Sequence, residues 1–201
     1  PLTAFKTIMH MRSFQYLSSS NISRGVQAGV VYYIISIGLT RFPNQANMAS
    51  MLSGCVACAP FLSYLLLTIL CRRKKACSLY FMGGIIACGA MLFLAVNRQP
   101  FLYAAAYFIL LTGESLIDQC YPLGMYEVVP LEVLGRFSAA WLLIYTFTSM
   151  ISTYVCGFLI ESGATTFIFF FGAVTALFSG WNFYKTLKNN QNYTDNLNKI
   201  K

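Results

Sequence analysis

Long apolar runs separated by short polar segments make up most of the chain. Each run holds about 20 predominantly apolar residues, the length that an α-helix needs to cross a hydrocarbon layer about 30 Å thick. The pattern predicts an all-α, polytopic membrane protein with six transmembrane helices. The predicted spans cover residues 16–39, 46–70, 76–96, 101–126, 137–160 and 165–187.

Two terminal segments flank this predicted membrane domain of residues 16–187. Residues 1–15 mix basic and apolar side chains, which indicates an amphipathic cytoplasmic lead-in at the membrane surface. Residues 188–201 are polar and rich in asparagine, so we expect them to form a disordered cytoplasmic tail.

The composition supports a membrane protein and excludes other classes. Hydrophobic residues make up 57% of the chain and charged residues only 10%, against about 25% charged residues in soluble domains. The net charge of +8 could indicate nucleic-acid binding, but the basic residues lie between and beyond the apolar runs. They do not interleave with aromatic residues on a polar surface, so we expect no nucleic-acid partner.

The basic residues instead predict the topology. With six spans, eleven of them fall on one side of the membrane and only Arg41 and Arg98 on the other. The positive-inside rule therefore places both termini in the cytoplasm and predicts a multi-pass protein of the plasma membrane. The eleven are Lys6, Arg12, Arg72, Arg73, Lys74, Lys75, Arg136, Lys185, Lys188, Lys199 and Lys201.

The sequence offers no recognisable enzyme chemistry. His10, the one histidine, lies outside the spans, and no glycine-rich phosphate loop occurs. Cys55 and Cys58 form a CxxC motif without a second pair, so we interpret them as small apolar residues rather than as metal ligands. We therefore expect no catalytic residue, no metal and no cofactor.

Apart from Lys185, at the cytoplasmic end of the sixth, three charged residues fall inside predicted spans. Glu114 and Asp118 lie in the fourth span and Arg24 lies in the first. A carboxylate near the membrane centre costs about 2.5–3.5 kcal/mol on insertion scales, so it requires a partner, a wet cavity or a function. The four-residue spacing puts Glu114 and Asp118 on one helix face.

Their depths predict which of them pair. Arg24 lies eight residues from the cytoplasmic start of its span, and Asp118 lies eight from the cytoplasmic end of its own, which places both roughly 12 Å deep. We predict that they form an ion pair. Glu114 lies one turn deeper, beside Asn21, Gln27 or an open cavity, and is the freer and more titratable carboxylate.

These residues have two interpretations. They could form a substrate and ion pathway, since secondary transporters carry such sites near the midplane between repeats; the charges lie on the opening helices of two successive groups of three. Alternatively, they could be a structural ion pair with a spare carboxylate. Aromatic residues in membrane helices usually pack or anchor, but some could line a cavity, and the candidates are Tyr32, Tyr121, Trp141 and Tyr145.

Several short motifs resemble those of a known superfamily. They are Asn21 and Arg24-Gly25 with Gly29 in the first span, the basic run Arg72–Lys75 between the second and third spans, and Pro130, Glu132, Gly135 and Arg136 after the fourth. With six spans, they resemble the carboxy-terminal half of a major facilitator superfamily transporter. The basic run departs from that pattern because it lacks the usual glycine and aspartate.

This resemblance implies two three-helix repeats, with the first, second, fourth and fifth spans lining a central cavity and the third and sixth facing lipid. It implies alternating-access transport of a small-molecule substrate, coupled to a proton or another cation. Such a transporter has two halves, so the partner would be an amino-terminal half of the same chain, which Pro1 as first residue favours, or a second copy. The alternative is a non-transporting scaffold or receptor-like protein.

Overall fold

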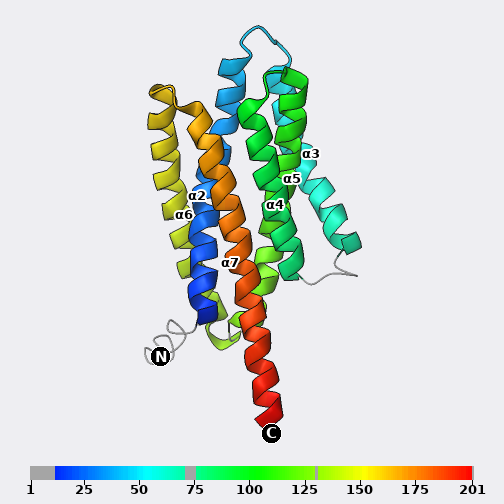
Figure 1. Cartoon of the computed structure of the whole chain (residues 1–201), viewed down its shortest axis with the longest axis vertical. Helices are drawn as coiled ribbons and strands as arrows, with labels where there is room; N and C mark the ends of the chain where they lie inside the picture. The colour runs from blue at the N-terminus through cyan, green and yellow to red at the C-terminus, as the bar shows by residue number, and fades with distance from the viewer. Residues whose placement is uncertain (1–11, 71–75, 130, 201) are drawn as a thin grey trace.

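The computed structural model describes residues 12–70, 76–129 and 131–200, which form helices and contain no strand (Figure 1). The chain enters and leaves the bundle at the same end (Figure 1). In chain order the helices are α2 (Arg12–Arg41), α3 (Met48–Leu70), α4 (Ala76–Val96), α5 (Pro100–Val128), α6 (Leu131–Glu161) and α7 (Thr165–Ile200).

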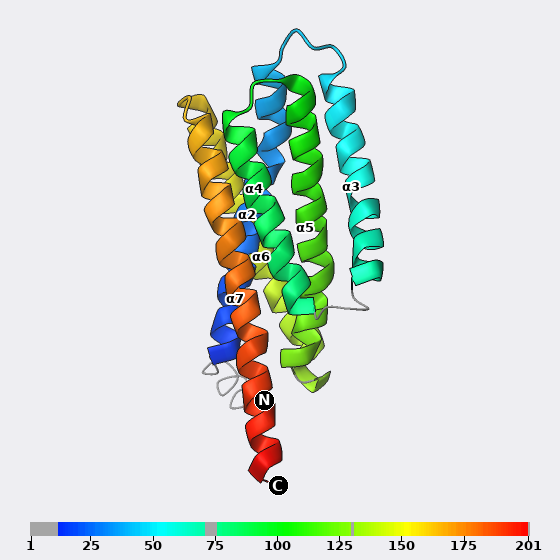
Figure 2. The same ribbon diagram turned by 45° about the vertical axis from the view of Figure 1, so that its right-hand side comes forward.

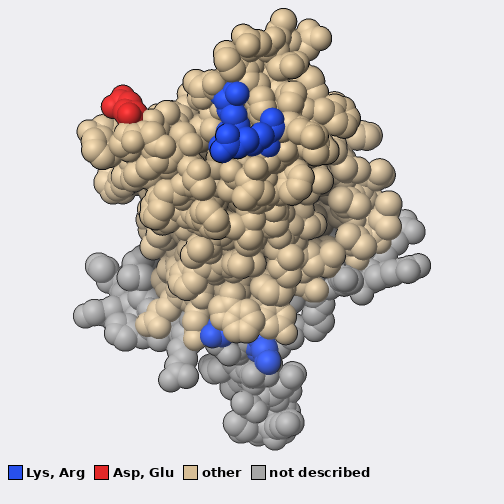
Figure 3. Space-filling view, turned by 45° about the horizontal axis from the view of Figure 1, so that its top comes forward, with Lys and Arg blue, Asp and Glu red and all other residues tan. Residues whose placement is uncertain are grey.

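Six of these described segments are long and apolar enough to cross a membrane, which confirms the predicted number of spans. On the face seen in Figure 3, the described basic and acidic side chains lie towards the two ends of the bundle, and the band between them is uncharged. The chain therefore has the architecture of a multi-pass membrane protein.

The connection between α5 and α6 is shorter than the sequence predicted. We expected a loop over residues 127–136, but α5 continues to Val128 and α6 begins at Leu131. Val129 has an extended backbone, with φ −101° and ψ 127°, as expected for a residue that precedes proline. Polar residues at the start of a helix resemble a loop in sequence, so the prediction began the fifth span six residues late.

The ends of the chain also differ from their predicted boundaries. Helix α7 extends to Ile200, over the segment for which we expected a disordered tail. No proline or glycine lies between Trp181 and Ile200 to end the helix. Most of the predicted lead-in and the basic run, residues 1–11 and 71–75, lie outside the described residues.

The helices pack in the spatial order α6, α2, α7, α4, α5, α3. Helices α3 and α6 lie at the two flanks, α3 against α5 and α6 against α2 (Figures 1 and 2). In the apolar stretches of α3 and α6 only 17% and 11% of residues are buried, against 44–50% in the other four spans. Each flanking helix thus leaves most of its surface uncovered within this chain.

Close contact between the central helices depends on residues without side chains. A Cβ atom on Gly113 of α5 would lie 2.9 Å from the carbonyl oxygen of Gly83 in α4, and the reverse distance is also 2.9 Å. These distances are shorter than real Cβ contacts, so the two backbones can approach this closely only because both positions are glycine. This packing fixes α4 against α5, the helix that carries Glu114 and Asp118.

An arginine ties four helices together at the end remote from the chain termini. Arg41, the last residue of α2, donates from Nη1 to the carbonyl oxygens of Leu94 (2.8 Å) and Asn97 (3.2 Å) at the end of α4. Its guanidinium also lies over the rings of Tyr103 in α5 and Phe169 in α7. Arg41, which the predicted topology places on the non-cytoplasmic side, therefore binds the carbonyl groups at the C-terminal end of α4.

We predict that Gly113→Ala lowers the thermal unfolding midpoint of the protein in detergent, because the new Cβ must displace the backbone of α4. Overpacking of this kind costs about 1–3 kcal/mol. The matched control is Gly89→Ala in α4, where no atom lies within 4 Å of the added Cβ; its midpoint should stay equal or rise. Equal midpoints for Gly113→Ala and the wild type would contradict the packing account.

Candidate functional site

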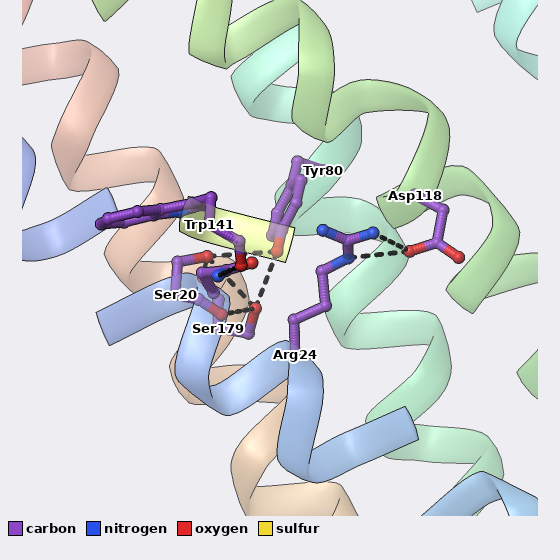
Figure 4. A network of polar contacts seen from close by, with 7 residues as sticks. Ser20, Arg24, Tyr80, Asp118, Trp141 and Ser179 are labelled. Atoms are coloured by element: carbon purple, nitrogen blue, oxygen red, sulfur yellow. Dashed lines mark hydrogen bonds and ion pairs between the residues drawn. The ribbon is translucent and has the colours of Figure 1, made fainter. Parts of the chain in front are cut away.

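An ion pair joins α2 to α5 near the end of the bundle where the chain begins. Arg24 of α2 donates from Nε to Oδ1 of Asp118 in α5 at 2.8 Å, and its Nη2 lies 2.7 Å from the same oxygen. Figure 4 shows the guanidinium reaching from α2 to the carboxylate. The pair that we predicted from equal depth is therefore confirmed.

Two tyrosine rings enclose the guanidinium of Arg24. Its Cζ atom lies 4.5 Å from the ring centroid of Tyr121 in α5 and 4.8 Å from that of Tyr145 in α6. Only 16% of the Arg24 side chain is exposed, compared with 52% for Asp118. Both distances fall within the range of attractive cation–π contacts, so the positive charge is held by one carboxylate and two aromatic faces.

Glu114 lies one turn from Asp118 on the same helix, and it has no comparable partner. Its Oε1 atom is buried without a hydrogen bond among the described residues. The Gln27 amide of α2 lies near this carboxyl group. Gln27 is fully buried, yet neither its Oε1 nor its Nε2 meets any described atom with hydrogen-bond geometry. Between α2 and α5, Oε1 of Glu114 and both polar atoms of Gln27 are therefore buried without a hydrogen bond of good geometry among the described residues, and buried polar atoms of this kind call for an explanation.

Five of the predicted site residues surround one hollow of about 200 Å³, and three of them also bond to each other. Asn21 donates from Nδ2 to the carbonyl oxygen of Trp141 at 3.0 Å, and Trp141 donates from its indole nitrogen to the hydroxyl of Tyr121. These bonds connect α2, α6 and α5. The five predicted residues among those that line it are Asn21, Arg24, Tyr121, Trp141 and Tyr145, whereas Glu114, Asp118 and Gln27 do not line it.

Tyr32 does not reach this group. Its side chain is 71% exposed, and its ring packs edge-on against that of Tyr33 at a centroid distance of 5.5 Å. Tyr33 instead lines a second hollow, of about 450 Å³, between α2 and α6, together with Tyr145 and Tyr154. Tyr145 borders both hollows and is the one lining residue that they share.

A buried hydroxyl cluster next to the site was not predicted. The hydroxyls of Ser20 in α2, Tyr80 in α4 and Ser179 in α7 lie 2.8–3.2 Å from one another (Figure 4). The Tyr80 ring also stacks on Phe183 at 3.9 Å. Every hydroxyl in this cluster has a partner, so it joins three helices and offers no free group to a ligand.

The remaining hollows carry less chemistry. A groove of about 350 Å³ between α3 and α5 contains both cysteines of the CxxC motif and is otherwise apolar. There, the Cys55 thiol donates to the Ala104 carbonyl oxygen at 3.4 Å. Within the described ranges, no three histidine, cysteine or acidic side chains gather as metal ligands.

Comparison with known proteins gives no further assignment. No family model matches the chain, and neither a curated protein nor a solved structure is similar to it.

We predict that Arg24 and Asp118 stabilise the fold as a pair. In a double-mutant cycle of Arg24→Gln and Asp118→Asn, unfolding in detergent should yield a coupling energy of about 1–3 kcal/mol. Each single change leaves one charge inside the bundle without its counter-ion, which is more costly than removing both.

The control cycle combines Arg41→Gln with Asp118→Asn. Arg41 lies 17 residues from Arg24 along α2, or about 25 Å, and shares no described partner with Asp118. These two changes should be additive. A coupling energy for Arg24 and Asp118 no larger than in this control would show that the pair is incidental.

Proposed function

We propose that the chain is one half of a secondary active transporter that moves a small solute across the plasma membrane by alternating access, as in the major facilitator superfamily. Glu114 is the group that takes up and releases the coupling proton. The observation that carries this proposal is a carboxyl group between the first and fourth spans, one turn from a complete ion pair, whose Oε1 atom is buried without a hydrogen bond among the described residues.

The packing order supports a repeat organisation. If the first three helices (α2, α3, α4) are exchanged with the last three (α5, α6, α7), the main contacts map onto themselves. The contact of α2 with α6 becomes that of α5 with α3, the contact of α2 with α7 becomes that of α5 with α4, and α4 remains against α7. Such internal symmetry is typical of transporters whose binding site lies between repeats.

The charges occupy equivalent helices in this arrangement. Arg24 lies on α2, and Asp118 and Glu114 lie on α5, the first helix of each group of three. Because Asp118 already neutralises Arg24, ionisation of Glu114 adds one uncompensated negative charge inside the membrane. A proton can remove that charge, so the protonation of Glu114 can favour one of two conformations.

The flanking helices are suited to a second half. Helices α3 and α6 expose large apolar side chains, and each has a major contact with one other helix only. An amino-terminal half of the same polypeptide, or a second copy, would cover part of these surfaces. Among the exposed side chains are Phe61, Tyr64, Leu65, Leu143, Phe147, Met150, Tyr154 and Phe158.

We predict that Glu114→Gln folds normally but abolishes proton-driven transport. The change removes a carboxyl group whose Oε1 atom is buried without a described hydrogen bond, so the unfolding midpoint should equal or exceed that of the wild type. The complete polypeptide, in vesicles with an imposed proton gradient, would be offered mixtures of sugars, amines and peptides, and their accumulation would be measured by mass spectrometry.

The control for this experiment is Glu161→Gln. Glu161 is an exposed carboxylate at the end of α6, and its replacement should leave accumulation unchanged. Gradient-driven accumulation that persists in Glu114→Gln would rule out proton coupling at this residue. A folded wild type that accumulates nothing from any mixture would favour the scaffold alternative.

A further inference from the structure

We propose that a groove between α4 and α5 binds one acyl chain of an anionic phospholipid, whose phosphate group lies at Arg98 in the connection between these two helices. This connection lies at the end of the bundle remote from the chain termini (Figure 1). The lipid site is separate from Glu114 and the Arg24–Asp118 pair, none of which lines the groove, and it does not depend on the proposed transport function.

The groove is an apolar hollow of about 460 Å³, and every described residue that lines it is apolar. Its small lining residues include Ala90 and Ala106, which are buried, whereas Phe93 and Ile109 are 45% and 50% exposed beside them. A Cβ atom on Gly89, which also lines the groove, would meet no atom within 4 Å. Small buried residues thus form a floor between larger exposed ones, and such a space suits a hydrocarbon chain.

The length of the groove matches one leaflet of a bilayer. Along α4 it runs from Phe93 to Ile85, a rise of about 12 Å, and along α5 from Leu102 to Ile109. Its outer end at Phe93 lies three residues before Val96, the last residue of α4, or about 5 Å. The sum is about 17 Å, against about 15 Å for half of a hydrocarbon layer. A chain that fills the groove therefore places its headgroup beside the connection between α4 and α5.

This connection carries positive charge without a described counter-ion. The Arg98 side chain is exposed and forms no hydrogen bond or ion pair with the described part of the chain. Arg41, at the same end, binds the carbonyl oxygens of Leu94 and Asn97 rather than a carboxylate. Figure 3 shows the described basic side chains at this end as one patch. Glu161 is the last residue of α6, a helix without a major contact to α4 or α5, so an anionic headgroup would supply the missing counter-charge.

The start of α5 adds to this positive charge. The first backbone N–H groups of a helix lack intrahelical partners and form the positive end of its dipole. In α5 the N-cap residue Gln99 forms no side-chain cap bond, and the first turn contains no acidic residue. A phosphate group is well suited to such a helix end. Leu102 of the same first turn lines the groove, so the headgroup site and the acyl-chain site adjoin each other.

Other occupants match only part of this arrangement. A sterol fills apolar space but brings no charge to Arg98. Phosphatidylcholine brings a phosphate group together with a second cation, for which the connection offers no described acidic partner. A soluble anion makes no use of the apolar groove. An anionic phospholipid combines the negative charge with a hydrocarbon chain, so it satisfies both parts of the site.

The test is photocrosslinking of the full chain in phosphatidylcholine vesicles that contain a small fraction of phosphatidylglycerol with a photoactivatable acyl chain. Peptide mass spectrometry should place most crosslinks on residues 85–93 and 102–109. Unlabelled phosphatidylglycerol should compete better than phosphatidylcholine or cholesterol. Arg98→Gln should lower the preference for phosphatidylglycerol over phosphatidylcholine about fivefold, whereas Lys188→Gln, at an exposed lysine of α7, should not.

A second pair of variants tests the groove itself. Gly89→Leu fills the groove and should abolish these crosslinks. The matched control is Gly54→Leu in the hollow between α3 and α5, where an added Cβ also meets no atom within 4 Å; it should leave the crosslinks unchanged. Unfolding midpoints equal to that of the wild type would show that both variants fold.

Three results would overturn the inference. Wild-type crosslinks spread evenly around the bundle would show an unselective annulus of lipid. Equal competition by phosphatidylglycerol and phosphatidylcholine would show that the site does not recognise an anionic headgroup. A wild-type preference retained in Arg98→Gln would exclude Arg98 as the phosphate ligand, and neither this variant nor the wild-type map requires Gly89→Leu to fold.

Discussion

The balance of charge inside the membrane is the constraint on which the rest of this structure depends. Arg24 and Asp118 satisfy each other at 2.7–2.8 Å, and Tyr121 and Tyr145 enclose the guanidinium. One carboxyl group, that of Glu114, is left over, with Oε1 unpaired among the described atoms. An apolar medium makes such a remainder expensive, and the proposed proton-coupled function rests on this surplus carboxyl group.

The surrounding packing holds this balance in place. Gly83 and Gly113 allow α4 to approach α5 closely. The Ser20–Tyr80–Ser179 cluster joins α2, α4 and α7. At the end of the bundle remote from the chain termini, Arg41 joins α2 to the end of α4. The four helices α2, α4, α5 and α7 therefore form a closely packed group. Helices α3 and α6 each pack mainly against one helix of this group, which leaves most of their surfaces uncovered within this chain.

The sequence predicted what helix geometry alone determines. The six spans follow from run length, and the pairing of Arg24 with Asp118 follows from a fixed rise per residue, because depth is then a matter of counting. The position of Tyr32 could not be predicted, since the face that it occupies depends on which helix lies opposite. The same holds for the Ser20–Tyr80–Ser179 cluster, whose members lie on three helices and carry no motif. The start of α6 was wrong because polar residues at a helix end look like a loop.

The central claim, that Glu114 takes up and releases a proton beside the Arg24–Asp118 ion pair, can be tested by infrared difference spectroscopy during a pH titration in nanodiscs. The account predicts a carbonyl band of a protonated carboxylic acid that disappears as the pH rises, that is absent in Glu114→Gln and that persists in Asp118→Asn. A band that is lost in Asp118→Asn and retained in Glu114→Gln would contradict the account.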